Sequence, residues 1–280
     1  MLKLHVFNTG WLSMREGELY LGGGRARRTL PVLAFVIEHP AGLVVFDTGL
    51  HANFAIDPST YVGPFGDQWL PFRSSPGMHL AAQMRAHGLS PADVAHVVLS
   101  HLHYDHSGDL RAFPQARLVV TREEWHAAQA LFKRGRGYLV KDYAGLGFTM
   151  VGFPAYRGQA SNPTLEGEYG LDMFNDGRLI LVPTYGHTFG HLSLLLSLPG
   201  GLVLLAGDAV YVHENYTLPA AQPNADAPEA AWRSTVSLRI LAKEDPQAII
   251  IPTHDDSKLR GLHRPDIAFV PWGAVYGWPG

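Results

Sequence analysis

The sequence contains no cysteine, which excludes disulfide bonds and thiolate metal sites. Any metal that this chain binds must therefore be held by nitrogen and oxygen ligands. It also lacks an apolar run of about 18 residues, the length that a membrane-spanning helix needs. The N-terminal stretch lacks the apolar core of a secretory signal as well. We therefore expect a cytoplasmic protein with no membrane partner.

The sequence also lacks a large excess of charge of either sign. The 280 residues carry 22 Lys and Arg against 25 Asp and Glu, a formal net charge of −3. Proteins bind phosphate backbones with clustered Lys and Arg, and the one dense basic run, Arg25–Arg28, is expected to be a solvated loop. Nucleic acid is therefore not expected as a partner. Apolar residues make up 46% of the chain, enough to bury a sizeable core.

Segments typical of strands alternate with segments of helical spacing in both halves of the chain. Short β-rich segments bounded by Gly or Pro predict strands at residues 2–7, 31–38, 42–46, 94–99, 116–120, 179–183, 192–198, 202–206 and, as the last strand, 248–252. Helical spacing predicts helices at residues 78–88, 121–131 and 228–243. Thr121 is the expected N-cap of the second helix, with Glu124 as its capping-box partner.

This mixture of elements favours an α/β fold in which sheets pack together with helices outside. We expect a single domain over residues 1–280. The stretch 132–172 is less regular and richer in Gly and aromatic residues, so it is expected to be an insertion.

The densest group of candidate metal ligands follows the predicted strand 94–99. Ser100 leads into His101, His103, Asp105 and His106, four candidate ligands within six residues. His101 and His103 are two apart, so in extended backbone their side chains point the same way, whereas Asp105 and His106 lie where the chain turns. Packing does not explain such a density of imidazoles. The arrangement predicts two metal ions side by side, zinc or one of its neighbours.

Further candidate ligands stand at the ends of three later strands. His187 follows strand 179–183, Asp208 follows strand 202–206 and His254 follows strand 248–252. Sites are often built at such positions on a rigid scaffold, so we expect these three to join the group at 101–106. Nine other histidines show no ligand-like neighbours in the sequence and are expected to be structural or exposed: His5, His39, His51, His79, His87, His96, His126, His213 and His263.

These residues resemble a known family. The motif His-x-His-x-Asp-His at residues 101–106, followed in order by His187, Asp208 and His254, is similar to that of dinuclear enzymes of the metallo-β-lactamase superfamily. Phe46-Asp47-Thr48-Gly49 and the sequence Gly-His-Thr-x-Gly-His at 186–191 resemble two further motifs of this family. The resemblance covers about residues 30–255. It implies an αβ/βα four-layer sandwich, with two mixed β-sheets face to face and helices outside.

The resemblance also implies a ligand assignment. One metal would be bound by His101, His103 and His187 and the other by Asp105, His106 and His254, with Asp208 bridging them. Asp47 and His191 would orient these ligands from outside. The cofactors would be two divalent metal ions, zinc being expected and iron, cobalt or manganese the alternatives. A hydroxide between the ions would be the nucleophile. The oxygen-reducing diiron branch typically carries Glu in place of His103, so this chain favours hydrolysis.

The substrate class follows from a closer resemblance, to the quorum-quenching N-acyl homoserine lactonases. These have a tyrosine three residues after the bridging aspartate, and Tyr211 stands at that offset from Asp208. Carried over, Tyr211 would donate a hydrogen bond to the developing oxyanion, and Asp105 could pass a proton to the leaving alkoxide. The expected substrate is a small lactone with an acyl tail. The insertion at 132–172 makes a homodimer the expected assembly.

An acyl tail would need an apolar groove, which aromatic residues of a loop over the site could line. The candidates in the Pro- and Gly-rich stretch 51–77 and in the first loop are Phe54, Tyr61, Phe65, Trp69, Phe72, Trp11 and Met14.

Two alternatives stay open at this point. The same two metals could serve a phosphotriesterase, or a thioesterase of the glyoxalase II kind, because those substrates also present a polarised oxygen. A β-lactamase is disfavoured, since the lactonase features are absent from that group. The other alternative is a metal-stabilised binding or sensing protein without turnover, and the complete set of seven ligands disfavours it.

Overall fold

The computed structural model describes residues 1–63, 72–130, 136–153, 170–218 and 220–269. One set of strands comprises β1 (Lys3–Arg15), β2 (Arg27–His39), β3 (Gly42–Phe46), β4 (Phe72–Arg73), β5 (Val94–Val98), β6 (Arg117–Thr121), β7 (Phe148–Val151) and β13 (Ile267–Phe269). The other set comprises β8 (Leu171–Asp172), β9 (Leu179–Pro183), β10 (Leu192–Leu198), β11 (Gly201–Gly207) and β12 (Ile249–Pro252). The α-helices are α1 (Glu16–Leu19), α2 (Asn53–Ile56), α3 (Pro58–Val62), α5 (Leu80–Ala86), α6 (Tyr104–Ser107), α7 (Arg122–Gln129), α8 (Val140–Tyr143), α9 (Glu214–Thr217) and α10 (Pro228–Glu244).

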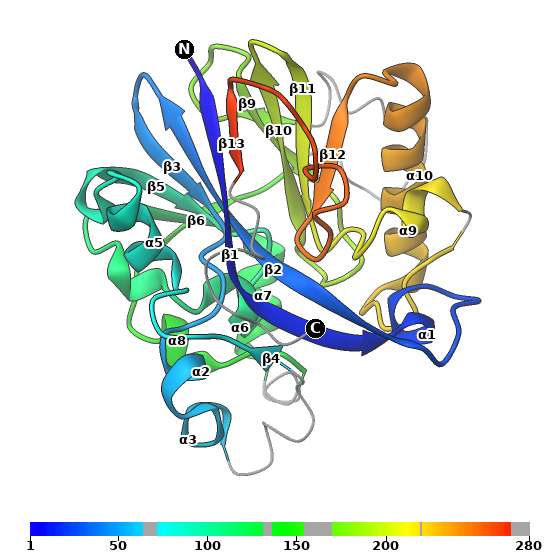
Figure 1. The fold of residues 1–280 in the computed structure, drawn as a ribbon, viewed down its shortest axis with the longest axis horizontal. Helices are drawn as coiled ribbons and strands as arrows, with labels where there is room; N and C mark the ends of the chain where they lie inside the picture. The colour runs from blue at the N-terminus through cyan, green and yellow to red at the C-terminus, as the bar shows by residue number, and fades with distance from the viewer. Residues whose placement is uncertain (64–71, 131–135, 154–169, 219, 270–280) are drawn as a thin grey trace.

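The two sets of strands form two mixed sheets (Figure 1). The first sheet has eight strands in the order β13-β1-β2-β3-β5-β6-β7, with β4 also pairing with β1. The second has five, in the order β12-β11-β10-β9-β8. Each sheet contains parallel pairs, such as β3 with β5 and β11 with β12, and antiparallel pairs, such as β2 with β3 and β10 with β11.

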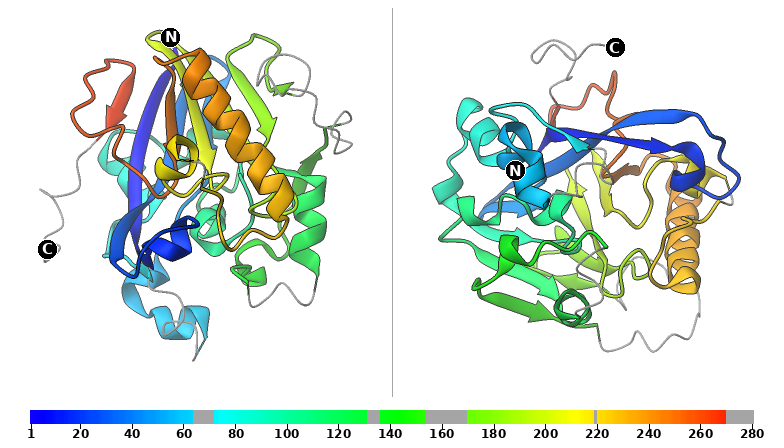
Figure 2. Two further views of the ribbon diagram at one scale, coloured as in Figure 1. Left: turned by 90° about the vertical axis from the view of Figure 1, so that its right-hand side faces the viewer. Right: turned by 90° about the horizontal axis from the view of Figure 1, so that it is seen from below.

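The main core lies between the sheets because buried strands alternate their side chains between two faces. Along β2, Phe35 belongs to the cluster between the sheets, while its neighbour Val36 packs on the outer side with Leu80 and Met84 of α5. On the far side, α10 lies across the outer face of the second sheet (Figure 2) and packs Leu238 against it. Helix, sheet, sheet and helix therefore make four layers, which confirms the predicted sandwich.

The predicted strands and helices are found close to their expected positions, with informative differences. β1 and β2 each run for 13 residues and form one long hairpin, with a bulge in β1 between Asn8 and Trp11. The prediction that 248–252 is the last strand is wrong, because β13 follows and pairs in parallel with β1. Its three residues are too few for an alternating pattern to reveal.

The range 132–172 contains regular structure in its described part. β7 pairs in parallel with β6 and forms an edge of the first sheet, and β8 forms an edge of the second. Part of this stretch therefore belongs to the scaffold itself. Among the described helices, none combines the length and the apolar character needed to cross a bilayer.

Candidate metal centre

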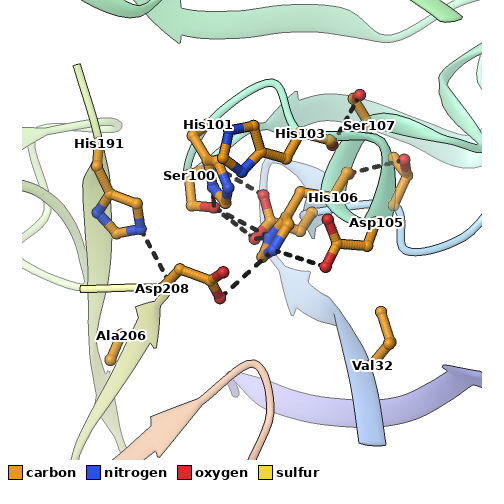
Figure 3. Close-up of polar contacts among 12 residues, drawn as sticks. Val32, Ser100, His101, His103, Asp105, His106, Ser107, His191, Ala206 and Asp208 are labelled. Atoms are coloured by element: carbon orange, nitrogen blue, oxygen red, sulfur yellow. Dashed lines mark hydrogen bonds and ion pairs between the residues drawn. The ribbon is translucent and has the colours of Figure 1, made fainter. Parts of the chain in front are cut away.

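Seven histidine and aspartate side chains converge where strands of both sheets end. β5 is followed by the 100–106 loop, β11 by Asp208 and β12 by His254, while His187 lies in the turn between β9 and β10. The carboxyl ends of neighbouring parallel strands lie at one edge of a sheet, which is where α/β proteins commonly bind ligands. In Figure 3, Asp105 and His106 from the segment after β5 and Asp208 from the end of β11 point toward one another.

The seven side chains form two groups, and within each group the candidate ligand atoms all lie within 4.8 Å of one another. We call His101, His103 and His187 the three-histidine group, and Asp105, His106, Asp208 and His254 the carboxylate group. These are the groups that the sequence resemblance implies, with Asp208 between them.

Distances within the two groups are short and similar. His187 Nε2 lies 3.2 Å from both His101 Nε2 and His103 Nδ1. His106 Nε2 and His254 Nε2 each lie 3.4 Å from Asp208 Oδ1. The other oxygen of Asp208, Oδ2, is 3.5 Å from His187 Nε2. The Asp208 carboxylate thus presents one oxygen to each group, as a bridging ligand must.

These spacings fit metal ligation. Ligands at about 2.0–2.1 Å from a tetrahedral ion are separated from one another by about 3.3–3.4 Å. His106 Nε2 and Asp208 Oδ1 are buried without a hydrogen-bond partner among the described residues, an arrangement that is rare unless an ion or water satisfies such atoms. Imidazole and carboxylate are ligands that zinc and its neighbours accept. The residues of the two groups therefore fit two divalent metal ions.

Asp47 orients His106 of the carboxylate group through hydrogen bonds. It is fully buried at the end of β3, and its Oδ2 accepts hydrogen bonds from His106 Nδ1 at 2.8 Å and from the Ser100 hydroxyl at 2.7 Å. Its Oδ1 accepts the Ser100 N–H at 2.7 Å. The Asp47 backbone is left-handed, with φ of 56°, a conformation that Asp tolerates better than most residues. Asp47 thus fixes His106 with its Nε2 turned toward Asp208.

His191 and Pro31 hold two further members of the carboxylate group. The Asp208 N–H donates to His191 Nε2 at 2.9 Å, and the Thr184 hydroxyl lies 2.9 Å from the other ring nitrogen of His191. His254 Nδ1 lies 2.9 Å from the Pro31 carbonyl oxygen, to which it donates. His254 Nε2 therefore remains available as a ligand atom. Asp47 and His191 both occupy the outer positions predicted for them.

Burial and charge set the protonation of the centre. Burial lowers the pKa of His101 well below its usual value and also lowers the pKa of His187. Burial would raise the pKa of Asp208, but His254 and His106 hold it well below the ordinary value. The same attraction raises the pKa of His106 and of His254 against the opposing effect of burial. Asp208 is thus ionised and His101 and His187 are neutral, as ligation requires.

Tyr211 lies between the two groups. Its ring centroid is 5.4 Å from that of His187 and 5.8 Å from that of His254. Its hydroxyl is 3.4 Å from His187 Nδ1. Burial, together with the negative charges of Asp208 and Asp105, raises the pKa of Tyr211 well above its usual value. The phenol therefore keeps its proton and can donate a hydrogen bond at the centre.

The backbone of Tyr211 is fixed by Asn215, a residue that the sequence did not single out. Asn215 Oδ1 accepts the N–H groups of Tyr211 and Val212 at 3.0 and 3.1 Å. Its Nδ2 donates to the carbonyl oxygens of Leu19 and Ala220, both at 3.1 Å. Asn215 is fully buried and uses donor and acceptor groups alike, so the Tyr211 segment is held firmly beside the centre.

Comparison with known proteins identifies the family. A model of the metallo-β-lactamase superfamily matches residues 27–254. The chain belongs to this superfamily. Its sequence is 33% identical over 258 residues to the N-acyl homoserine lactonase AttM of Azorhizobium caulinodans, covering 91% of this chain and 93% of that protein. It is 26% identical over 234 residues to an N-acyl homoserine lactonase of Bacillus cereus, covering 83% and 84%.

Solved structures show the same metallo-β-lactamase fold. An N-acyl homoserine lactone hydrolase with N-hexanoyl-L-homoserine bound at its catalytic metal centre superposes with a TM-score of 0.75 at 23% identity, covering 93% of this chain and 96% of that one. The dizinc lactonase AidC superposes with a TM-score of 0.61 at 16% identity, covering 90% and 87%. Together with the two ligand groups, the superfamily fold supports two divalent metal ions in this chain.

Among the described residues, the aromatic side chains of the stretch 51–77 do not line the predicted groove. Phe54, Tyr61 and Phe72 are each at most 7% exposed, because they pack against one another and against Tyr104. They therefore form a closed apolar cluster. Trp11 and Met14 are half-buried and pack against apolar clusters. Phe65 and Trp69 lie outside the described residues.

His213 was one of the nine histidines for which we expected no ligand-like neighbours, but the structure places such neighbours beside it. His213 gathers with Glu214 and Asp255, and its Nδ1 lies 2.8 Å from Asp255 Oδ2. The adjacent Glu214 was visible in the sequence, but Asp255 is brought there only by the fold. Arg28 also pairs with Glu214 at 2.7 Å, so this half-exposed group ties the β1–β2 hairpin to α9.

Proposed function

We propose that this chain opens the lactone ring of N-acyl homoserine lactones, a quorum-quenching activity. The observation that carries the proposal is the buried Tyr211 phenol, which stands between the three-histidine and carboxylate groups beside the Asp208 bridge. The AttM lactonases, which are 30–33% identical over 91% of this chain, support the same substrate class.

The residues of the centre have distinct tasks in this proposal. Two divalent ions held there would lower the pKa of water and polarise a carbonyl oxygen. Tyr211 donates its hydroxyl hydrogen bond to the lactone carbonyl oxygen, where negative charge develops as the ring carbon becomes tetrahedral. Asp105 belongs to the carboxylate group, where its carboxylate could pass the proton of the attacking hydroxyl to the leaving alkoxide. Ring opening then leaves a carboxylate and an alcohol.

The metal, the assembly and the location of the protein are part of the proposal as well. We propose zinc as the metal, because the ligands are imidazole and carboxylate and thiolate is absent. We also propose a homodimer and a cytoplasmic location, as the sequence led us to expect. Metal analysis of the protein as isolated, sedimentation analysis and cell fractionation test these statements separately.

A panel of substrates tests the proposed activity. With the zinc-loaded protein and a pH indicator, an acyl homoserine lactone should give a kcat/KM at least about 100-fold above that for paraoxon or a glutathione thioester, a margin that a substrate-shaped site can supply. A simple γ-lactone without the acyl amide completes the panel. Higher turnover of paraoxon or of the thioester would assign the centre to one of the alternative hydrolases.

Tyr211→Phe separates the lactone mechanism from metal binding. We expect kcat for the acyl homoserine lactone to fall about 100-fold, since one donor to the developing oxyanion is lost, while two metal ions stay bound. Tyr216→Phe is the matched control, because Tyr216 is a buried tyrosine that packs against the second sheet and α10. Unchanged lactone turnover in Tyr211→Phe would remove the main structural support for the lactone assignment.

A further inference from the structure

Glu124 is a buried carboxylate that belongs to neither ligand group. It lies in the first turn of α7 and is fully buried. The predicted N-cap is confirmed, because the Thr121 hydroxyl accepts the Glu124 N–H at 3.1 Å. The Glu124 carboxylate does not make the return bond to the Thr121 backbone that the predicted capping box would have. Instead Glu124 Oε1 accepts hydrogen bonds from the Leu102 N–H and the Tyr138 hydroxyl, both at 2.9 Å.

Both of these contacts lead to the three-histidine group. Leu102 is the residue between His101 and His103, so its bond to Glu124 fixes the backbone that carries two ligands. Tyr138 forms a β-bridge with His103, and its ring stands edge-on to the His103 ring at a centroid distance of 4.7 Å. One carboxylate oxygen therefore holds both the backbone and the aromatic wall of His103.

The third histidine of the group is held from the same helix end. His187 lies in the 186–191 turn, and the Thr121 hydroxyl donates to the Gly190 carbonyl oxygen in that turn at 2.6 Å. Gly190 lies so close to α7 that a Cβ there would be 2.0 Å from the Glu124 nitrogen. Burial raises the pKa of Glu124, and the hydrogen bonds from the Leu102 N–H and the Tyr138 hydroxyl offset part of that rise. The start of α7 thus contacts the segments that carry all three histidines.

The carboxylate group is held by other residues. His106 is bonded to Asp47, His254 to the Pro31 carbonyl and Asp208 to His191. None of these contacts passes through Glu124. The two groups therefore have separate supports, although they share one edge of the sandwich.

We propose that Glu124 is a positioning residue for the three-histidine group, holding His101, His103 and His187 at the spacing that binds one of the two metal ions. A carboxylate suits this task because it only accepts hydrogen bonds and offers about four lone-pair sites, while the Leu102 amide and the Tyr138 hydroxyl both donate to it. A buried charge whose partners are an amide and a hydroxyl is costly, and capping a helix does not require one. The inference rests on the metal assignment of the proposed function and not on its substrate.

Zinc affinity tests this inference directly. The two dissociation constants for Zn²⁺ are measured by competition with a chromophoric chelator, without substrate, in wild type, Glu124→Ala, Glu124→Gln and Tyr138→Phe. In Glu124→Ala we expect one ion to bind about 10–100-fold more weakly, the usual effect of losing an outer partner of metal ligands, and the other to be unchanged. Glu124→Gln should lie between, because its amide oxygen can still accept both hydrogen bonds but lacks the negative charge that strengthens them. Ala128→Gly weakens the same helix and should leave both constants unchanged.

Double variants identify which ion is affected. Because His103→Ala already disrupts the three-histidine group, adding Glu124→Ala should remove no further metal. Because Asp105→Asn disrupts the carboxylate group, adding Glu124→Ala should weaken the remaining ion. The effect of Tyr138→Phe should vanish in a Glu124→Ala background, since Tyr138 acts through Glu124.

Several outcomes would overturn the inference. These are wild-type affinity for both ions in Glu124→Ala, or an equal loss of both ions. If Glu124→Ala does not fold, Glu124→Gln and Tyr138→Phe decide, and unchanged zinc affinity in both would refute the assignment. Failure of the wild-type protein to bind two Zn²⁺ ions would instead refute the proposed function itself.

Discussion

Asp208→Asn is expected to lower kcat/KM for the lactone at least about 1000-fold, or about 4 kcal/mol in activation free energy, and to remove one metal equivalent. The reason is geometric and electrostatic. Asp208 presents one oxygen to His187 Nε2 at 3.5 Å and the other to His106 and His254 at 3.4 Å. Asparagine keeps the shape but replaces one of these oxygens by an NH2 group and removes the negative charge that offsets the cations. Activity and metal content are measured on the same preparation.

The control for this variant is a buried aspartate remote from the centre. Asp266 is 7% exposed and forms an ion pair with Arg264 at 2.7 Å. It directly precedes β13, an edge strand of the first sheet. Asp266→Asn should retain both metals and full lactone turnover. His106→Ala should resemble Asp208→Asn, because it removes a ligand of the same group. Full activity with unchanged metal content in Asp208→Asn would contradict the site assignment.

Gly186→Ala is expected to lower the free energy of unfolding by about 4 kcal/mol. Gly186 precedes His187 and has a φ of +135°, and a Cβ there would lie 2.0 Å from the Ala231 nitrogen at the start of α10. The estimate combines backbone strain of about 1–3 kcal/mol with overpacking of about 1–3 kcal/mol. Urea unfolding of the metal-depleted protein measures it without interference from metal loss.

Gly201→Ala separates the two causes. Gly201 has a φ of +113°, but nothing lies within 4 Å of the position of its Cβ. Its substitution should therefore cost only the backbone strain, about 1–3 kcal/mol. Equal destabilisation by the two variants would show that the close contact between the 186–191 turn and α10 is not what requires glycine at 186.

The ligand groups could be predicted because their signal is local and dense. His101, His103, Asp105 and His106 stand within one short loop, and His187, Asp208 and His254 each follow an apolar strand. The family resemblance then divided them into the two groups that the structure brings together. The mixture of strand and helix patterns likewise predicted sheets packed together with helices outside, and the family resemblance implied the four layers.

The residues that orient the ligands were harder to predict because their partners are distant in sequence. Glu124 fits a capping box locally, yet its carboxylate bonds Leu102 and Tyr138, which only the fold brings near. Asn215 carries no chemical signal of its own, although it fixes the Tyr211 backbone through two hydrogen bonds of the following turn. The sequence around Phe54 showed that aromatic residues are frequent there, but not which way their side chains point. In the structure they pack against one another instead of lining a groove.

The central claim is that two metal ions, held by the three-histidine and carboxylate groups, are required for lactone hydrolysis. The most direct test titrates metal-depleted protein with Zn²⁺ while the ring opening of N-hexanoyl homoserine lactone is followed with a pH indicator. We predict no hydrolysis before zinc is added and a rate that saturates at two equivalents per chain. Undiminished hydrolysis by the metal-depleted protein, or saturation at a single equivalent, would contradict it.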